Sequence, residues 1–388
     1  MGEEYRARSL LPPARGSLRR VVSITSHFQS ESPLHPGAKL ALPSVFEQSW
    51  PDPAKLGDDS RSASILLHEA TETLAGHLGV RPAELGFLGD HSSGFHIALS
   101  GLLTPESRLI HSAIDRQDLF AVAAHHQARG SVNEILEVDL DGHISWPSEI
   151  ASASPTINEP SNRGRQVIAW QLMNGETGGI NPAPQTDSVP IFYDATASGV
   201  RIPLPSNWST ALWDSRSWGG PSGLTVFARR EGSAWRNPLP HLNNRLTPEG
   251  VSPALIILSA LSIDSWVADE KSQALKIAQA NARIRGYITE EIGDVDIASP
   301  ADASDHLLSF SFLFVDAEKL VHDLAARGVA VDSGSACNST NLEPSHVLAA
   351  MGRLTQGNIR LTLKHNLLPE DVDLLLLALK ECVNAQRS

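Results

Sequence analysis

The chain has 388 residues, of which 41% are hydrophobic and 19% charged, and its formal net charge is −13 from 31 basic and 44 acidic residues. This length allows two domains around a substantial core. An acidic chain lacks the surplus of Lys and Arg that binding along a phosphate backbone requires, so direct DNA binding is not expected.

The two cysteines, Cys337 and Cys382, limit the chemistry further. Two thiols are too few for a disulfide framework, a zinc site built from cysteines or an iron–sulfur cluster held by this chain alone. The sequence has no spacing typical of a metal site, and no apolar run reaches the length of a membrane span. We therefore expect a cytoplasmic protein without a metal or a membrane segment, in which residues 1–25 form a flexible arm.

The first two thirds of the chain alternate helical and strand-like patterns. A helix is predicted over 65–78, because apolar residues recur there at helical spacing. Further helices are predicted at 94–102 and 118–129, and short apolar strands at 85–88, 108–111, 135–138, 167–172, 191–194 and 223–228. Strands that alternate with helices indicate an α/β fold with a mainly parallel sheet.

The last third predicts a smaller α+β unit. A long helix is expected over 253–285, followed by strands at 306–314 and 359–363 and helices at 317–327 and 369–384. Residues 147–165 are rich in Ser, Pro and Asn and are predicted to form a surface connection. We expect a large domain over 26–260 and, over 261–388, a linking helix with a small C-terminal domain.

The most informative segment reads Ser-Gly-Ser-Ala-Cys over 333–337. Its small residues predict a mobile loop with an exposed thiol at Cys337, which is a nucleophile when its pKa is lowered. Pro344 is expected to open a helix, and Arg360 follows on a strand from which it could bind a carboxylate in bidentate fashion. The alternative interpretation of Cys337 is a small buried residue, and that of Arg360 is a solvated strand residue or a structural ion pair.

Together these segments resemble the cysteine desulfurases of the NifS/IscS type, in the class-V aminotransferase family. The resemblance implies fold type I of pyridoxal-phosphate (PLP) enzymes and a homodimer with active sites at its interface. It also implies that Cys337 matches the loop cysteine that takes sulfur from free cysteine as a persulfide. Arg360 matches the arginine that binds the substrate carboxylate.

Weaker matches extend the resemblance over residues 26–385. The segment Asp-Ala-Thr-Ala-Ser-Gly at 194–199 resembles the one whose aspartate pairs with the pyridine nitrogen of the cofactor, so Asp194 takes that place. The segment Met-Asn-Gly-Glu-Thr-Gly at 173–178 resembles a Val-Asn-Asn-Glu turn. A Gly-Pro-Ser-Gly hairpin at 220–223 also matches.

The match breaks down at the residue that should hold the cofactor. The family lysine, three residues before the Gly220-Pro221 pair, is Ser217, and no lysine lies between Lys55 and Lys271. A hydroxyl cannot form the Schiff base on which the family reaction depends.

Other expected cofactor contacts are altered as well. The segment that cradles the phosphate begins here with Asp90, whose carboxylate repels a phosphate, although Ser92 and Ser93 remain as donors. The histidine that stacks on the pyridine ring falls at Arg116. Two further contacts have become the smaller residues Gly175 and Ala197.

Three functions follow as hypotheses. The first is a PLP-free pseudoenzyme in which Cys337 carries sulfur, or a partner subunit, with a tRNA thiolase, an iron–sulfur scaffold protein or another sulfur acceptor as partner. The second is a working PLP-dependent desulfurase that binds the cofactor noncovalently or recruits another lysine, such as Lys364. The third is a structural scaffold without sulfur chemistry. The altered contacts favour the first, for which no cofactor is predicted.

Overall fold

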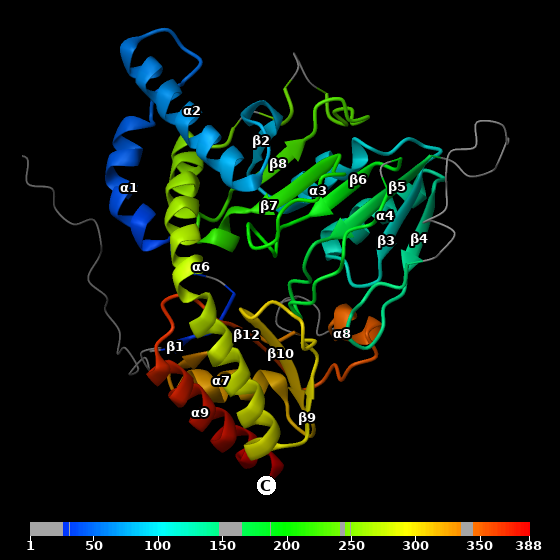
Figure 1. Cartoon of the computed structure of the whole chain (residues 1–388), viewed down its shortest axis with the longest axis vertical. Helices are drawn as coiled ribbons and strands as arrows, with labels where there is room; N and C mark the ends of the chain where they lie inside the picture. Colours follow the sequence, from blue (N-terminus) through cyan, green and yellow to red (C-terminus); the bar gives the residue numbers. More distant parts are fainter. Residues whose placement is uncertain are drawn as a thin grey trace, which may run out of the picture.

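Figure 1 shows the computed structural model, which describes residues 26–30, 32–146, 165–186, 188–240, 245–248, 250–334 and 344–388. Cys337, the predicted arm 1–25 and nearly all of the predicted connection 147–165 lie outside the described residues. The larger part of the described chain surrounds one sheet, and the long helix α6 runs from it into a smaller part that contains α7 and α9.

A seven-stranded sheet forms the centre of the larger part, in the order β2-β8-β7-β6-β5-β3-β4. Its strands are β2 (Leu85–Leu88), β3 (Arg108–Ser112), β4 (Val132–Leu136), β5 (Gln166–Gln171), β6 (Ile191–Asp194), β7 (Thr210–Asp214) and β8 (Thr225–Arg229). Strands β3 to β7 pair in parallel, whereas β8 is antiparallel to both β7 and β2. The predicted α/β fold with a mainly parallel sheet is confirmed.

Helices cover both faces of this sheet. They are α1 (Pro36–Gln48), α2 (Asp58–Leu78), α3 (His91–Ser100), α4 (Gln117–Ala128) and the first half of α6 (Pro253–Tyr287), with the short 3-10 helices η1 (Pro82–Glu84) and η2 (Ser215–Trp218) beside them. Neighbouring residues of β5 point to opposite faces, as strand geometry requires. Ala169 belongs to the core under α3 and α4, and Ile168 to the core under α1, α2 and α6.

The smaller part has its own apolar core, to which Ile277 and Ile284 from the second half of α6 contribute. Its main sheet is antiparallel, in the order β12-β10-β9. Its elements are β9 (Val295–Ile297), β10 (Leu307–Phe312), β11 (Val329–Ala330), β12 (Asn358–Thr362), α7 (Ala317–Ala326), α9 (Pro369–Arg387) and the π-helical turn η3 (Ile288–Ile292). The strand β1 (Ser26–His27) pairs with β11, so the start of the described chain is tied to this part.

The predicted helix start at Pro344 is wrong by two residues. Helix α8 (His346–Ala350) begins after Ser345, whose Oγ accepts a hydrogen bond from the Leu348 amide at 3.2 Å. A serine side chain satisfies an unpaired amide of the first turn, and this fixes Ser345 as the N-cap. Among the described residues, no helix is both long and apolar enough to cross a lipid bilayer.

Candidate active site

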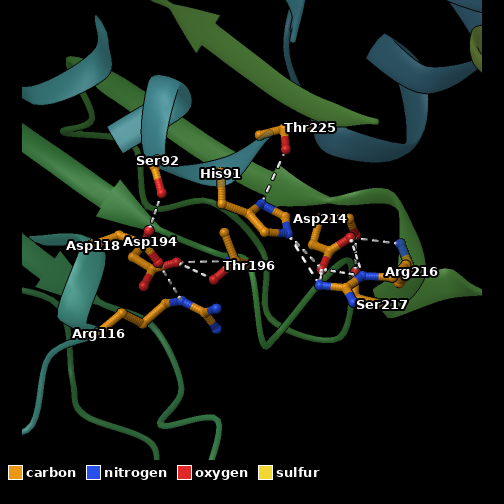
Figure 2. A network of polar contacts seen from close by, with 10 residues as sticks. All are labelled: His91, Ser92, Arg116, Asp118, Asp194, Thr196, Asp214, Arg216, Ser217 and Thr225. Atoms are coloured by element: carbon orange, nitrogen blue, oxygen red, sulfur yellow. Dashed lines mark hydrogen bonds and ion pairs between the residues drawn. The ribbon is translucent and has the colours of Figure 1, made fainter. Parts of the chain in front are cut away.

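The residues predicted around the cofactor gather at one edge of the seven-stranded sheet (Figure 2). Strands β3, β5, β6 and β7 end at this edge, and ligands of open α/β sheets bind beyond the carboxyl ends of such strands. Strand β6 ends in Asp194, β7 ends in Asp214, and Arg116 lies between β3 and α4. In the described part of the chain, no cluster of His, Cys, Asp and Glu side chains could hold a metal ion.

Asp194 is buried at the end of β6, and the positively charged side chain of Arg116 is close enough to interact with it. Its Oδ1 accepts hydrogen bonds from the amide of Thr196 at 2.9 Å and from the Thr196 hydroxyl at 2.6 Å. Burial raises the pKa of the Asp194 carboxyl, and the charge of Arg116 opposes this rise. Arg116 also approaches Asp118, with 3.7 Å between Nε and Oδ2. A cation that belongs to the chain thus faces the carboxylate of Asp194.

The N-terminus of α3 is engaged by side chains of the chain itself. Asp90 is the N-cap, and its Oδ1 accepts a hydrogen bond from the Ser93 amide at 2.7 Å. The Ser92 hydroxyl donates to Oδ1 of Asp118 at 2.6 Å. An amide and a hydroxyl that could serve a phosphate are therefore already paired with carboxylates.

A compact ion-pair network lies between α3 and β7. His91 Nε2 is 3.0 Å from Oδ2 of Asp214, and His91 Nδ1 is 3.0 Å from Oγ1 of Thr225. Arg216 approaches the same oxygen of Asp214, from Nε at 2.9 Å and from Nη2 at 2.8 Å. Burial by itself would raise the pKa of Asp214, but the hydrogen bonds from His91 and Arg216 outweigh it and lower the pKa to about 2.

This pKa predicts how stability depends on pH. Because the pKa of Asp214 in the folded protein lies below its ordinary 3.8, the carboxylate stabilises the folded state above about pH 4, and the contribution is lost as the pH falls toward 2. We expect Asp214→Asn to lower the free energy of unfolding at pH 7 by about 2 kcal/mol, and by much less at pH 2.5. Urea unfolding at both pH values measures this difference.

The control for this prediction is Asp59→Asn, since Asp59 is exposed in the first turn of α2. It should change the free energy of unfolding by less than about 0.5 kcal/mol at either pH. Equal losses for Asp214→Asn at pH 7 and pH 2.5 would contradict the role given to the carboxylate charge.

Ser217, which the sequence predicts to take the lysine position, lies on η2 directly after β7. Its Oγ donates to the main-chain carbonyl of Asp214 at 2.7 Å, and its own carbonyl accepts from Nη1 of Arg201 at 3.4 Å. A Cβ placed on Gly199 would lie 2.5 Å from the Ser217 hydroxyl oxygen, so the two residues pack directly together. The Ser217 hydroxyl is therefore engaged by the main chain of the residue three positions before it.

In the smaller part, Arg360 forms the ion pair that the sequence left open as an alternative. Its Nη2 donates to Oδ2 of Asp332 at 3.4 Å, and the main chains of the two residues exchange hydrogen bonds. The Arg360 side chain is 11% exposed. Its role in binding a substrate carboxylate stays a prediction, as does the role of Cys337.

The sequence did not predict the pairing of His91 with Asp214. Strand β7, which ends in Asp214, contains only three apolar residues, Ala211 to Trp213, and such a short run has no readable period. The feature of the sequence that could have drawn attention to this site is the position of Asp214, between a short buried strand and the Gly220-Pro221 hairpin.

Comparison with known proteins places the chain among desulfurase relatives. Residues 252–375 match the model of the family Aminotransferase class-V. An IscS-like cysteine desulfurase of Mycobacterium tuberculosis is 27% identical over 92% of this chain and 95% of its own length. The cysteine desulfurase IscS of Dictyoglomus turgidum is 24% identical over 93% and 94%.

Solved structures agree with this placement at the level of the fold. A NifS-like protein superposes with a TM-score of 0.80 at 19% identity, over 93% of this chain and 99% of its own. The apo structure of a cysteine desulfurase from Thermococcus onnurineus has a TM-score of 0.73 at 14% identity, over 93% and 95%. The chain is therefore a cysteine desulfurase-like protein with fold type I of PLP enzymes.

Proposed function

We propose that this chain works without pyridoxal phosphate, as a sulfur-transfer protein in which Cys337 carries the sulfur. The observation that carries the proposal is Ser217, which stands at the position of the lysine and whose hydroxyl is bound to the carbonyl of Asp214. A serine cannot supply the amine that would hold the cofactor or move a proton from the substrate.

The charges at the sheet edge support the same conclusion. A cofactor phosphate at the N-terminus of α3 would approach the carboxylates of Asp90 and Asp214. The pKa of Asp214 is about 2, so this carboxylate is ionised at neutral pH. The carboxylate is already paired with Arg216, and its Oδ2 lies 3.0 Å from Nε2 of His91, so a doubly charged phosphate would have to disrupt these contacts. The residues present do not fit a phosphate.

At the place where the resemblance puts the pyridine ring of the cofactor, the side chain of Arg116 lies beside two small residues, Gly175 and Ala197. An added Cβ on Gly175 would lie 3.3 Å from the Cβ of Ala197 and 4.0 Å from Nη1 of Arg116. Two small residues thus flank a long side chain where the family has larger polar residues and a histidine. The guanidinium faces Asp194 with the positive charge that a protonated pyridine nitrogen would bring. This favours a site that is complete without a cofactor.

Sulfur transfer needs no cofactor once a persulfide is supplied. The Cys337 thiolate attacks the outer sulfur of a donor persulfide, the sulfur–sulfur bond of the donor breaks, and the donor leaves as a thiolate. A second exchange of the same kind passes the sulfur to an acceptor and regenerates the thiolate. The chain would act as a homodimer or beside a partner subunit, with a tRNA thiolase or an iron–sulfur scaffold protein as acceptor. A scaffold role without sulfur chemistry is the competing outcome of the tests.

The cofactor is tested by absorbance. We expect the purified protein to be colourless, and added PLP to produce no aldimine band that borohydride traps on a lysine. Ser217→Lys is expected to leave desulfuration of cysteine undetectable, because Asp90, Arg116 and Asp214 still oppose the cofactor and residues that act as a unit are not restored one at a time.

The control is the same titration with a PLP-binding desulfurase at equal concentration. A trapped adduct in the native protein, on Lys364 or any other lysine, would overturn the proposal and favour the PLP-dependent alternative. Release of sulfide from cysteine by Ser217→Lys would show that the phosphate and ring contacts are intact.

A further inference from the structure

An open groove of about 580 Å³ lies where α8 meets the turn that follows β4. Residues 138–141 line one side of the groove, and residues 350–352, at the end of α8, line the other. Figure 1 shows this turn reaching from β4 to α8. The groove shares no lining residue with the ion-pair network around Asp214, so it is a separate feature of the surface.

The floor of the groove is apolar. Met351 is almost fully buried and belongs, with Ile114 and Val347, to a small core of its own. Partly buried apolar side chains from both sides of the groove pack against this core. A Cβ placed on Gly142 would lie 3.3 Å from Cε of Met351, so the turn and the end of α8 are in direct contact.

Leu140 stands at the rim of the groove with 57% of its surface exposed. Its backbone is held in place, because Nε of Arg353 donates to the Leu140 carbonyl at 2.7 Å. Oδ1 of Asp139 accepts hydrogen bonds from the amides of Asp141 and His143, both at 2.9 Å, and closes the turn. An exposed leucine on a turn fixed in this way is pre-organised for a partner, since little conformational entropy remains to be lost on binding.

Carboxylates flank the apolar floor on the side of Arg353. Nη2 of Arg353 lies 2.9 Å from Oδ1 of Asp141, and Nη1 lies 2.9 Å from Oδ1 of Asp296. One guanidinium is thus shared between two carboxylates. Its charge cannot balance both of them, so this side of the groove stays negative.

Two further carboxylates lie around His143. Nδ1 of His143 is 3.4 Å from Oδ2 of Asp139, and Nε2 is 3.6 Å from Oδ2 of Asp302, whose side chain is 70% exposed. Burial by itself would raise the pKa of Asp139, but the hydrogen bonds from the His143 and Asp141 amides outweigh it and lower the pKa. Four carboxylates therefore stand beside the groove with one guanidinium among them.

This combination selects the kind of partner that fits. Nucleic acids and anionic membranes are repelled by carboxylates. A second copy of the chain would bring a further net charge of −13. A protein segment that carries Lys or Arg on either side of an apolar residue matches both features, since its cations meet the aspartates and its apolar side chain covers Leu140.

We propose that this groove docks a basic segment of another protein, with an apolar anchor against Leu140 and lysine or arginine side chains against the surrounding aspartates. The inference goes beyond the proposed function, because it identifies a partner by its chemistry and holds whether or not Cys337 carries sulfur. It depends only on residues 138–143, 296, 302 and 350–353.

The test uses the three methionines, Met1, Met173 and Met351, as NMR reporters. The full chain, labelled with carbon-13 at the methionine methyl groups, is titrated with the peptide Lys-Arg-Lys-Leu-Lys-Arg-Lys. We expect a saturable shift of the Met351 signal, which Met351→Leu assigns, and no shift of the fully buried Met173. Serine in place of the peptide leucine should weaken binding about tenfold, and glutamate in place of its cations should abolish it.

Variants of the groove carry the comparison. Leu140→Ser should weaken binding of the peptide about tenfold, and Asp302→Lys about fivefold with a smaller effect at high salt. Leu56→Ser and Glu47→Lys are the matched controls, since both side chains are exposed in the region of α1 and α2, which Figure 1 shows away from α8. They should leave binding within about twofold of the native protein.

The proposal is overturned if the peptide leaves the Met351 signal unmoved, or if Glu47→Lys weakens binding as much as Asp302→Lys, which would indicate attraction to net charge alone. Sedimentation of the native protein and Leu140→Ser provides the remaining check. If the serine variant dissociates a native oligomer, the groove is a contact between copies of the chain and the proposal fails. None of these results affects the persulfide assay of Cys337, so failure here is distinguishable from failure of the proposed function.

Discussion

Replacing Cys337 by serine is expected to abolish the acceptance of persulfide sulfur by this chain. A hydroxyl neither attacks the outer sulfur of a persulfide nor forms a sulfur–sulfur bond, so the loss should be complete rather than partial. The measurement is mass spectrometry of the intact protein after incubation with a small-molecule persulfide or with an active desulfurase and cysteine. The native protein should gain the mass of sulfur at Cys337, and the variant should gain none there.

Cys382 supplies the matched control within the same chain. It is buried in α9, and burial raises its pKa, so less of the reactive thiolate is present and access is poor. Cys382→Ser should therefore load sulfur at the native rate. Sulfur found equally on both cysteines of the native protein, or an unchanged partner-dependent activity in Cys337→Ser, would leave the scaffold role as the function.

Replacing Trp218 by alanine is expected to lower the free energy of unfolding by about 3–5 kcal/mol, the usual cost of removing a large buried side chain. Trp218 follows Ser217 directly, is fully buried and belongs to the main core. Its indole Nε1 donates to Oγ of Ser259 on α6 at 3.1 Å. The variant thus loses a packed ring and a buried hydrogen bond that ties η2 to the long helix. Urea unfolding followed by circular dichroism gives the value without relying on tryptophan fluorescence.

Two variants distinguish the contribution of the buried indole hydrogen bond from the contribution of ring packing to the free energy of unfolding. Trp218→Phe keeps an aromatic ring but not the indole donor, so it should lose less, on the order of 1–3 kcal/mol, since Ser259 still contacts Oγ of Ser215 at 2.8 Å. Trp50→Ala removes a tryptophan that is 74% exposed and should change the free energy by less than about 0.5 kcal/mol. A loss below 1 kcal/mol for Trp218→Ala would contradict the role given to this side chain next to Ser217.

Long periodic and short apolar segments were predictable because their pattern depends on the local backbone. The helix predicted over 253–285 is α6 (Pro253–Tyr287), and the strand predicted over 191–194 is β6 (Ile191–Asp194). Proline misled the prediction elsewhere. Helix α1 contains Pro43 inside it and was not predicted, because proline usually ends a helix and the packing of α1 on α6 is invisible in the local sequence.

The fold was predictable from the sequence alone, through the alternation of strands and helices and the motifs near the C-terminus. The sequence alone also predicts that Ser217 takes the position of the cofactor lysine, and the identity of this one side chain decides whether a Schiff base can form. The folded structure alone shows that Asp214 pairs with His91, which lies 123 positions earlier in the chain, and with Arg216. It alone shows that Arg353 donates to the carbonyl of Leu140, 213 positions earlier in the chain. Such contacts depend on which strands end at the same edge of the sheet and on how the two parts pack, and neither leaves a periodic trace in the sequence.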